Sequence, residues 1–114
     1  MRDIKDAPVF QLTFDILKDF HVIRLKFPKT EKYSLGGKIE ETLLSTLILI
    51  LEAGYAKRQF KTTSIERAML KTDLTKVLIR LAWEIDALKE KQYLALQERL
   101  QRISQMLGGW KRSL

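Results

Sequence analysis

The amino-acid sequence predicts an all-α protein that folds as an antiparallel up-down four-helix bundle. Apolar residues recur at spacings of three and four along most of the chain, which is the periodicity of an amphipathic helix. The chain has only two prolines and five glycines, and these residues divide it into four long segments. The linkers between the segments are short, about three to seven residues, so consecutive helices are expected to lie antiparallel. With 114 residues, of which 46% are hydrophobic, the chain is expected to form one domain over residues 1–114.

The first helix is expected to run from Pro8 to Phe27, because proline is favoured in a first turn and Pro28 cannot continue a helix. Its main apolar stripe consists of Val9, Leu12, Ile16, Phe20, Ile23 and Phe27. A second stripe beside it consists of Phe10, Phe14, Leu17, His21 and Leu25. One bundle interior does not require both stripes, so the second is expected to contact other subunits of a homo-oligomer. The alternative is that local distortion rotates the helices, so that this second stripe and the Ile79 and Trp83 pair of the third helix both lie at the edge of the core.

The second helix is expected to run from about Ser34 to Tyr55. The apolar residues expected to face inward are Leu43, Leu44, Leu47, Ile50 and Leu51. Gly36 and Gly54 project to the same side of this helix. Because glycine has no side chain, these two positions would allow a neighbouring helix to come close.

The third helix is expected to open with a capping box, the segment TSIE from Thr63 to Glu66, whose reciprocal hydrogen bonds satisfy two free backbone amides. Its inward stripe is expected to consist of Leu70, Leu74, Val77, Leu78, Leu81, Ile85 and Leu88. Ile79 and Trp83 point nearly opposite to this stripe. Exposed large apolar groups are typical anchors in binding hot spots, so these two residues are expected to anchor a partner.

The fourth helix carries a seam with strict three-four spacing, as in helices that pack in bundles. The seam consists of Tyr93, Leu96, Leu100, Ile103, Leu107 and Trp110. Two interpretations fit the glycines before Trp110. Either Gly108 and Gly109 leave room for a helix of a neighbouring subunit, with Trp110 in the oligomer interface, or Gly109 begins a C-cap and Trp110 folds back over the bundle end.

The net charge of +7, from 21 Lys and Arg against 14 Asp and Glu, favours an anionic partner. The residues expected to contact nucleic acid or another acidic partner are Lys57, Arg58, Lys61, Arg67, Lys71, Lys76 and Arg80. The alternative is that they form an ordinary solvated coat. No basic helix carries Asn or Gln where bases are read, and aromatic residues are not interleaved with the basic ones. Binding to the phosphate backbone is therefore expected to be sensitive to salt and poor at reading sequence.

Several classes of function are excluded by what the sequence lacks. There is no cysteine, which fits a reducing cytoplasm, and no signal peptide or apolar stretch long enough to span a membrane, so a cytoplasmic protein is expected. His21 is the only histidine, and no carboxylate pair, nucleophile or metal-ligand spacing accompanies it. We therefore expect no enzyme activity, no metal site and no cofactor.

Residues 27–57 and 76–113 resemble the accessory variability determinant proteins, Avd, of diversity-generating retroelements. The most specific pieces are the segments YSLG and IE at positions 33–36 and 39–40, RLA at 80–82 and MLGGW at 106–110. The similarity covers the chain from about Phe10 onward. That family also resembles the four-helix-bundle proteins encoded in intervening sequences of 23S ribosomal RNA.

The resemblance implies a homopentameric barrel of bundles that binds a reverse transcriptase and RNA or DNA, and so supports mutagenic cDNA synthesis without catalysing it. Two basic residues four apart on the third helix occur in the family, and Lys76 and Arg80 hold the matching positions. A lysine cannot make the bidentate contact of an arginine, which weakens that match. The alternative function is that of an oligomeric structural RNA-binding protein of the intervening-sequence type, with no polymerase partner.

Overall fold

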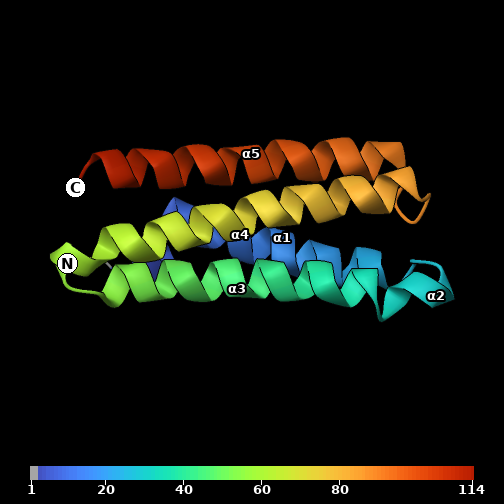
Figure 1. Ribbon diagram of the computed structural model, residues 1–114, viewed down its shortest axis with the longest axis horizontal. Coiled ribbons are helices and arrows are strands. Elements are labelled where there is room, and N and C mark those ends of the chain that lie inside the picture. Colours follow the sequence, from blue (N-terminus) through green and yellow to red (C-terminus); the bar gives the residue numbers. More distant parts are fainter. Residues whose placement is uncertain (1–2) are drawn as a thin grey trace.

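Four long helices lie side by side in the computed structural model, which describes residues 3–114 (Figure 1). They are α1 (Pro8–Arg24), α3 (Leu35–Tyr55), α4 (Arg58–Glu84) and α5 (Glu90–Arg112). A one-turn helix, α2 (Lys29–Lys32), lies between α1 and α3, and a short 3₁₀ helix, η1 (Ile4–Asp6), precedes α1. Consecutive long helices run in opposite directions, and residues 3–114 contain no strand. The predicted four-helix bundle is confirmed.

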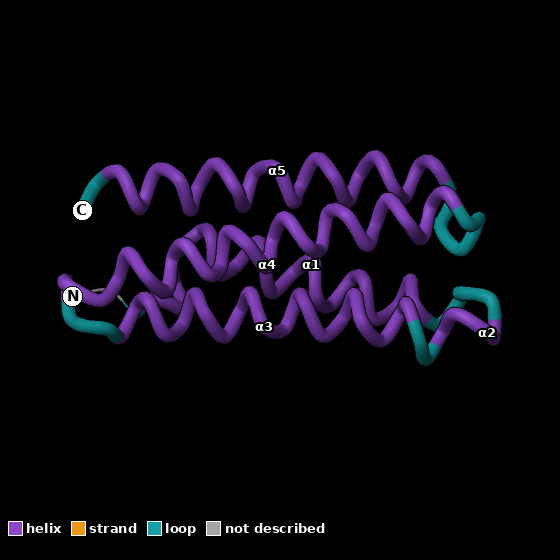
Figure 2. The backbone as a smooth tube through the Cα atoms, in the orientation of Figure 1, coloured by secondary structure: helices purple, strands orange, loops and turns teal. Residues whose placement is uncertain are grey.

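The bundle is elongated and closes on itself. α3 packs between α1 and α4, and α5 packs on α4 and completes the ring against α1. The Cα atoms extend over 43 × 20 × 19 Å. Both chain ends and the α3–α4 connection lie at one end of the bundle, and α2 and the α4–α5 connection lie at the other (Figure 2). No helix in the described part of the chain is long and apolar enough to cross a membrane.

The first helix ends three residues earlier than predicted. Leu25, Lys26 and Phe27 each donate a backbone N–H to the carbonyl three residues before, at 3.0–3.2 Å, so the chain tightens after Arg24. This turn brings the Phe27 ring edge-on against Phe20, with centroids 5.7 Å apart, and buries it. Pro28 then ends this turn and precedes α2.

The connection from α3 to α4 is shorter than predicted, because α4 begins at Arg58 and not at a capping box beginning at Thr63. The free amides of the first turn therefore belong to residues 58–61. Lys61 has a structural role here, since its ammonium group donates to the carbonyls of Ala53 at 2.8 Å and Gly54 at 3.0 Å. It thereby satisfies carbonyl groups at the C-terminus of α3.

The inward seam of α5 is confirmed, and that of α3 is confirmed in part. Leu96, Leu100, Ile103 and Leu107 are buried, and Tyr93 and Trp110 at the ends of the seam are half-buried. On α3, Leu43, Leu47 and Ile50 are buried and Leu51 is half-buried. Leu44 was expected to face inward and is instead 46% exposed.

Candidate interaction surfaces

The third long helix, α4, packs into the bundle through the face opposite to the one predicted. Its buried residues are Ser64, Ile65, Ala68, Thr72, Thr75, Ile79 and Ala82. Five residues of the predicted inward stripe form an exposed row that we call the α4 stripe: Leu70 (68% exposed), Leu74 (39%), Val77 (62%), Leu81 (46%) and Ile85 (45%). Exposed apolar side chains in such a row are the kind of surface that protein contacts bury, and a partner for the α4 stripe stays a prediction.

Small side chains explain why α4 turns this face inward. The Thr75 hydroxyl lies 2.9 Å from the Thr42 hydroxyl of α3, so the two helices approach closely there. Thr72 and Thr75 donate their hydroxyl protons to the carbonyls of Ala68 and Lys71, each at 2.8 Å, and therefore carry no unsatisfied polar group into the core. Leucines would be too large for this narrow contact, so they lie on the outer face.

Ile79 and Trp83 were expected to point away from the core, and this placement is wrong. Ile79 is 1% exposed and belongs to the core, so it is not available to anchor a partner. The Trp83 ring is half-buried and stacks on Tyr93 of α5, with centroids 4.4 Å apart and an angle of 10° between the planes. Both residues pack within the bundle, and contact of the exposed part of Trp83 with a partner stays a prediction.

A second exposed apolar surface lies between α1 and α3. It forms a groove of about 520 Å³ whose lining consists of the apolar residues Phe14, Leu17, Val22 and Leu44 and of Lys18, His21 and Glu40. Leu25, which follows α1, is 56% exposed. Four residues of the predicted second stripe, Phe14, Leu17, His21 and Leu25, thus lie at the surface or half-buried, and their contact with other subunits stays a prediction.

Phe10 differs from the other residues of that stripe. It is 9% exposed and its ring stacks on Phe14, with centroids 6.2 Å apart, so it packs within its own chain. The expectation that Phe10 faces other subunits is therefore wrong. Phe10 lies near the start of α1, where Val9 beside it is also buried, which shows that the helix turns both residues inward at this end.

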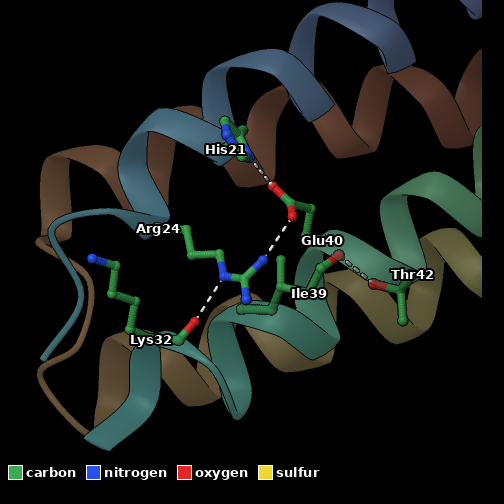
Figure 3. A network of polar contacts seen from close by, with 6 residues as sticks. All are labelled: His21, Arg24, Lys32, Ile39, Glu40 and Thr42. Atoms are coloured by element: carbon green, nitrogen blue, oxygen red, sulfur yellow. Dashed lines mark hydrogen bonds and ion pairs between the residues drawn. The ribbon is translucent and has the colours of Figure 1, made fainter. Parts of the chain in front are cut away.

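A polar network joins α1, α2 and α3 at the end of the groove (Figure 3). The Arg24 guanidinium donates to Glu40 Oε2 and to the Lys32 carbonyl, each at 2.7 Å. Glu40 Oε1 lies 2.6 Å from Nδ1 of His21. His21 thus lies at the surface within hydrogen-bond distance of the Glu40 carboxylate.

This corner depends on Gly36. A Cβ atom at Gly36 would lie 2.9 Å from Arg24 Cγ and 3.3 Å from both the Glu31 carbonyl and the Phe27 ring. Gly36→Ala should therefore lower the free energy of unfolding by about 1–3 kcal/mol, as overpacking does elsewhere. Gly109→Ala is the matched control, because Gly109 also lies within a helix and its Cβ would meet only the exposed Arg112 guanidinium, at 3.9 Å. Urea denaturation of both variants checks this expectation, and equal stabilities would contradict it.

The predicted basic pair of α4 is divided between two roles. The Lys76 ammonium donates to Gln101 Oε1 at 2.9 Å and to Ser104 Oγ at 2.8 Å, and so clamps α4 to α5. Arg80 extends into solvent and pairs with Glu84 at 2.8 Å. Of the two residues, only Arg80 can leave its present ion pair for a contact with another molecule at little cost in stability.

The other predicted basic residues also differ in how they are engaged. Lys61 caps α3, and Arg67 lies 3.9 Å from Glu52. Lys57, Arg58 and Lys71 have no carboxylate within 4.0 Å among residues 3–114. Lys57 and Arg58 are exposed at the bundle end that holds the chain termini, whereas Lys71 is half-buried farther along α4. The structure does not gather the seven residues into one patch.

The glycines near the C-terminus do not end a helix. α5 continues through Gly108 and Gly109 to Arg112, so the C-cap interpretation is wrong. Among residues 3–114, a Cβ at either glycine would meet only the guanidinium of Arg112 within 4 Å, so no other described helix approaches that closely. Gly109 and Trp110 instead line a cavity of about 530 Å³ against the η1 end of the chain. Contact of Trp110 with a neighbouring subunit stays a prediction.

The surfaces described so far consist of exposed apolar rows and grooves and of separate charged side chains. The described part of the chain holds no group of three or more His, Cys, Asp or Glu residues placed to bind a metal ion. A comparison with known protein families matches residues 9–114 to the family described as bAvd-like. The chain belongs to the bAvd-like family. The resemblance to Avd proteins is thereby confirmed, and the bAvd-like family is one of accessory, non-catalytic proteins. A search among curated proteins finds no match for the chain.

Proposed function

We propose that this protein is the non-catalytic accessory subunit of a diversity-generating retroelement, which assembles into an oligomer and holds a reverse transcriptase on its nucleic acid. The match to the bAvd-like family over residues 9–114 carries this proposal. The net charge of +7 supports it, because each subunit adds cations that release counterions when they neutralise phosphates. The alternative function is that of a structural RNA-binding oligomer without a polymerase partner. It is favoured if no reverse transcriptase associates with the protein.

Two different apolar surfaces on one chain support self-assembly. The α4 stripe projects from a convex helix, whereas the α1–α3 surface is a groove. When two different faces of one protein bind each other, the contacts run head to tail and close into a ring if the rotation permits. A ring of five subunits is the form that the family resemblance implies, and sedimentation of the purified protein measures the number.

Arg80 is the residue of the predicted basic pair that a partner can reach. Arg80→Glu is expected to weaken co-purification with the reverse transcriptase by about tenfold. The substitution replaces a positive charge at the rim of the contact by a negative one, which an acidic partner repels. Lys76→Glu is a poorer test, since it would break the clamp between α4 and α5.

Arg102→Glu is the matched control for Arg80→Glu. Arg102 is also exposed and also pairs with a glutamate four positions away, Glu98, at 3.2 Å. Co-purification of all three proteins with a tagged reverse transcriptase, at equal input, separates a specific contact from a general effect of charge. Equal recovery of the two variants would remove Arg80 from the contact with the enzyme.

A further inference from the structure

The most exposed large apolar side chain in the described part of the chain is Tyr33, which follows α2. Its ring is 75% exposed. The Arg24 guanidinium carbon and the Lys32 ammonium nitrogen lie over this ring, each 5.7 Å from its centre, so a base would stack on the part of the ring that they leave open. An accessible aromatic ring flanked by cations is the combination with which proteins bind single-stranded nucleic acid, because bases stack on the ring and phosphates pair with the cations.

The local structure restrains one of the two cations beside the ring. Arg24 is held by its hydrogen bonds to Glu40 and to the Lys32 carbonyl, and its side chain is only 20% exposed (Figure 3). The guanidinium therefore keeps its place next to Tyr33 when no ligand is bound. A surface that is ordered before binding loses less conformational entropy when the ligand arrives.

Further lysines lie at the same end of the bundle. Lys26 and Lys29 are exposed on the segment that leads into α2, and Lys89 and Lys91 are exposed at the start of α5. Figure 1 shows that both segments lie at the end of the bundle opposite to the chain termini. None of these four lysines has a carboxylate within 4.0 Å among residues 3–114.

The acidic residues at this end do not cancel that charge. They are Glu31, Asp86 and Glu90, together with two that are already paired, Glu40 with Arg24 and His21, and Glu84 with Arg80. Glu31 accepts a hydrogen bond from the Ser34 hydroxyl at 3.3 Å. The lysines and Arg24 outnumber these carboxylates, so an anionic ligand is favoured.

We propose that the α2 end of the bundle binds single-stranded nucleic acid, with one base stacked on Tyr33 and neighbouring phosphates held by Lys26 and Lys29. This inference rests on the nucleic-acid binding of the proposed function and gives that binding a place. A single strand fits better than a duplex, because the bases of a duplex are stacked on one another and cannot cover the ring.

The stacking is tested with Tyr33→Ser and a fluorescein-labelled oligouridylate of about 15 nucleotides, a length that fits the site sizes of single-strand-binding proteins. Loss of one base–aromatic stack should weaken binding by about tenfold in fluorescence anisotropy. Tyr33→Phe should bind like the wild type, because it keeps the ring. A labelled duplex of the same length should bind Tyr33→Ser and the wild type equally.

Tyr55→Ser is the matched control for the ring. Tyr55 is also exposed, at 66%, and lies at the opposite end of the bundle. The Tyr55→Ser variant should bind the single strand with wild-type affinity. If Tyr33→Ser binds the oligouridylate as tightly as Tyr55→Ser does, the stacking role of Tyr33 is refuted.

The phosphate contacts are tested with Lys26→Gln and Lys29→Gln together, measured over a salt series. Each lost phosphate contact should reduce the slope of log K against log salt by roughly 0.7 for a single strand. Lys111→Gln together with Arg112→Gln is the charge-matched control, because both residues are exposed at the end of α5 on the other end of the bundle. A reduced slope in this control, with none in the Lys26 and Lys29 variant, would overturn the placement.

The binding measurements distinguish an error in the placement of this site from an error in the proposed function. If the wild type binds neither the oligouridylate nor the duplex at low salt, the nucleic-acid role itself is wrong. If the wild type binds and every α2-end variant binds equally well, only the site is wrong. Binding of an acidic protein at this end, without any binding of nucleic acid, would also overturn the inference.

Discussion

Changing Leu70 and Val77 to glutamate is expected to convert an oligomer of this protein into single chains. Both side chains lie on the α4 stripe and are more than 60% exposed, so the bundle itself does not need them. In a subunit interface they would be buried, and a buried carboxylate without a partner costs several kcal/mol. Sedimentation velocity of wild type and variant at equal concentration gives the result, and circular dichroism establishes that the variant is folded.

Leu94→Glu is the matched control for the α4 stripe. Leu94 is 59% exposed on α5, away from the stripe, so its replacement should leave the assembly unchanged. A double variant of Leu70 and Val77 that sediments like the wild-type oligomer would show that subunits do not meet on α4. A wild type that sediments as a single chain at micromolar concentration would refute self-assembly altogether.

The second large effect is expected from Ile79→Ala, which should lower the free energy of unfolding by about 2–5 kcal/mol. Ile79 is 1% exposed, and its removal leaves a cavity that the closely packed α3 and α4 cannot fill. Leu81→Ala should cost less than about 1 kcal/mol, because Leu81 is 46% exposed. This order is the reverse of the one that the sequence pattern predicts.

Both alanine variants are best measured in the background of the Leu70 and Val77 glutamate variant. In that background no subunit contact adds to the stability of either side chain, so urea denaturation reports the bundle alone. If Leu81→Ala proved the more damaging of the two, the orientation of α4 described here would be wrong.

Much of the fold follows from the sequence. Proline at position 8, the apolar period and the short linkers predict four antiparallel helices, and the seam of α5 from Leu96 to Leu107 is buried as predicted. The predicted helix boundaries were less accurate where a side chain forms hydrogen bonds with a neighbouring helix. The sequence places Lys61 in the α3–α4 connection among the residues expected to contact an acidic partner. In the structure α4 begins at Arg58, and the Lys61 ammonium group caps α3.

The candidate surfaces were harder to predict, because their residues come together from separate parts of the chain. Tyr33 lies nine positions after Arg24, and their contact depends on the turn after α1 and on α2. Lys76 has the spacing of a free basic residue, yet its ammonium group is held by two side chains of α5. Local spacing contains no information about such partners.

The sequence by itself determined that the protein is helical, where most of its helices lie and that α4 has two different faces. Only the tertiary structure decided which of those faces is inside. Leucine is the more hydrophobic choice for a core, but α3 presents Thr42 and Thr46 to its neighbours. Alanine and threonine pack most closely against such a surface, and the threonine hydroxyls donate to carbonyls of their own helix. The leucines of α4 are therefore left on the outer surface.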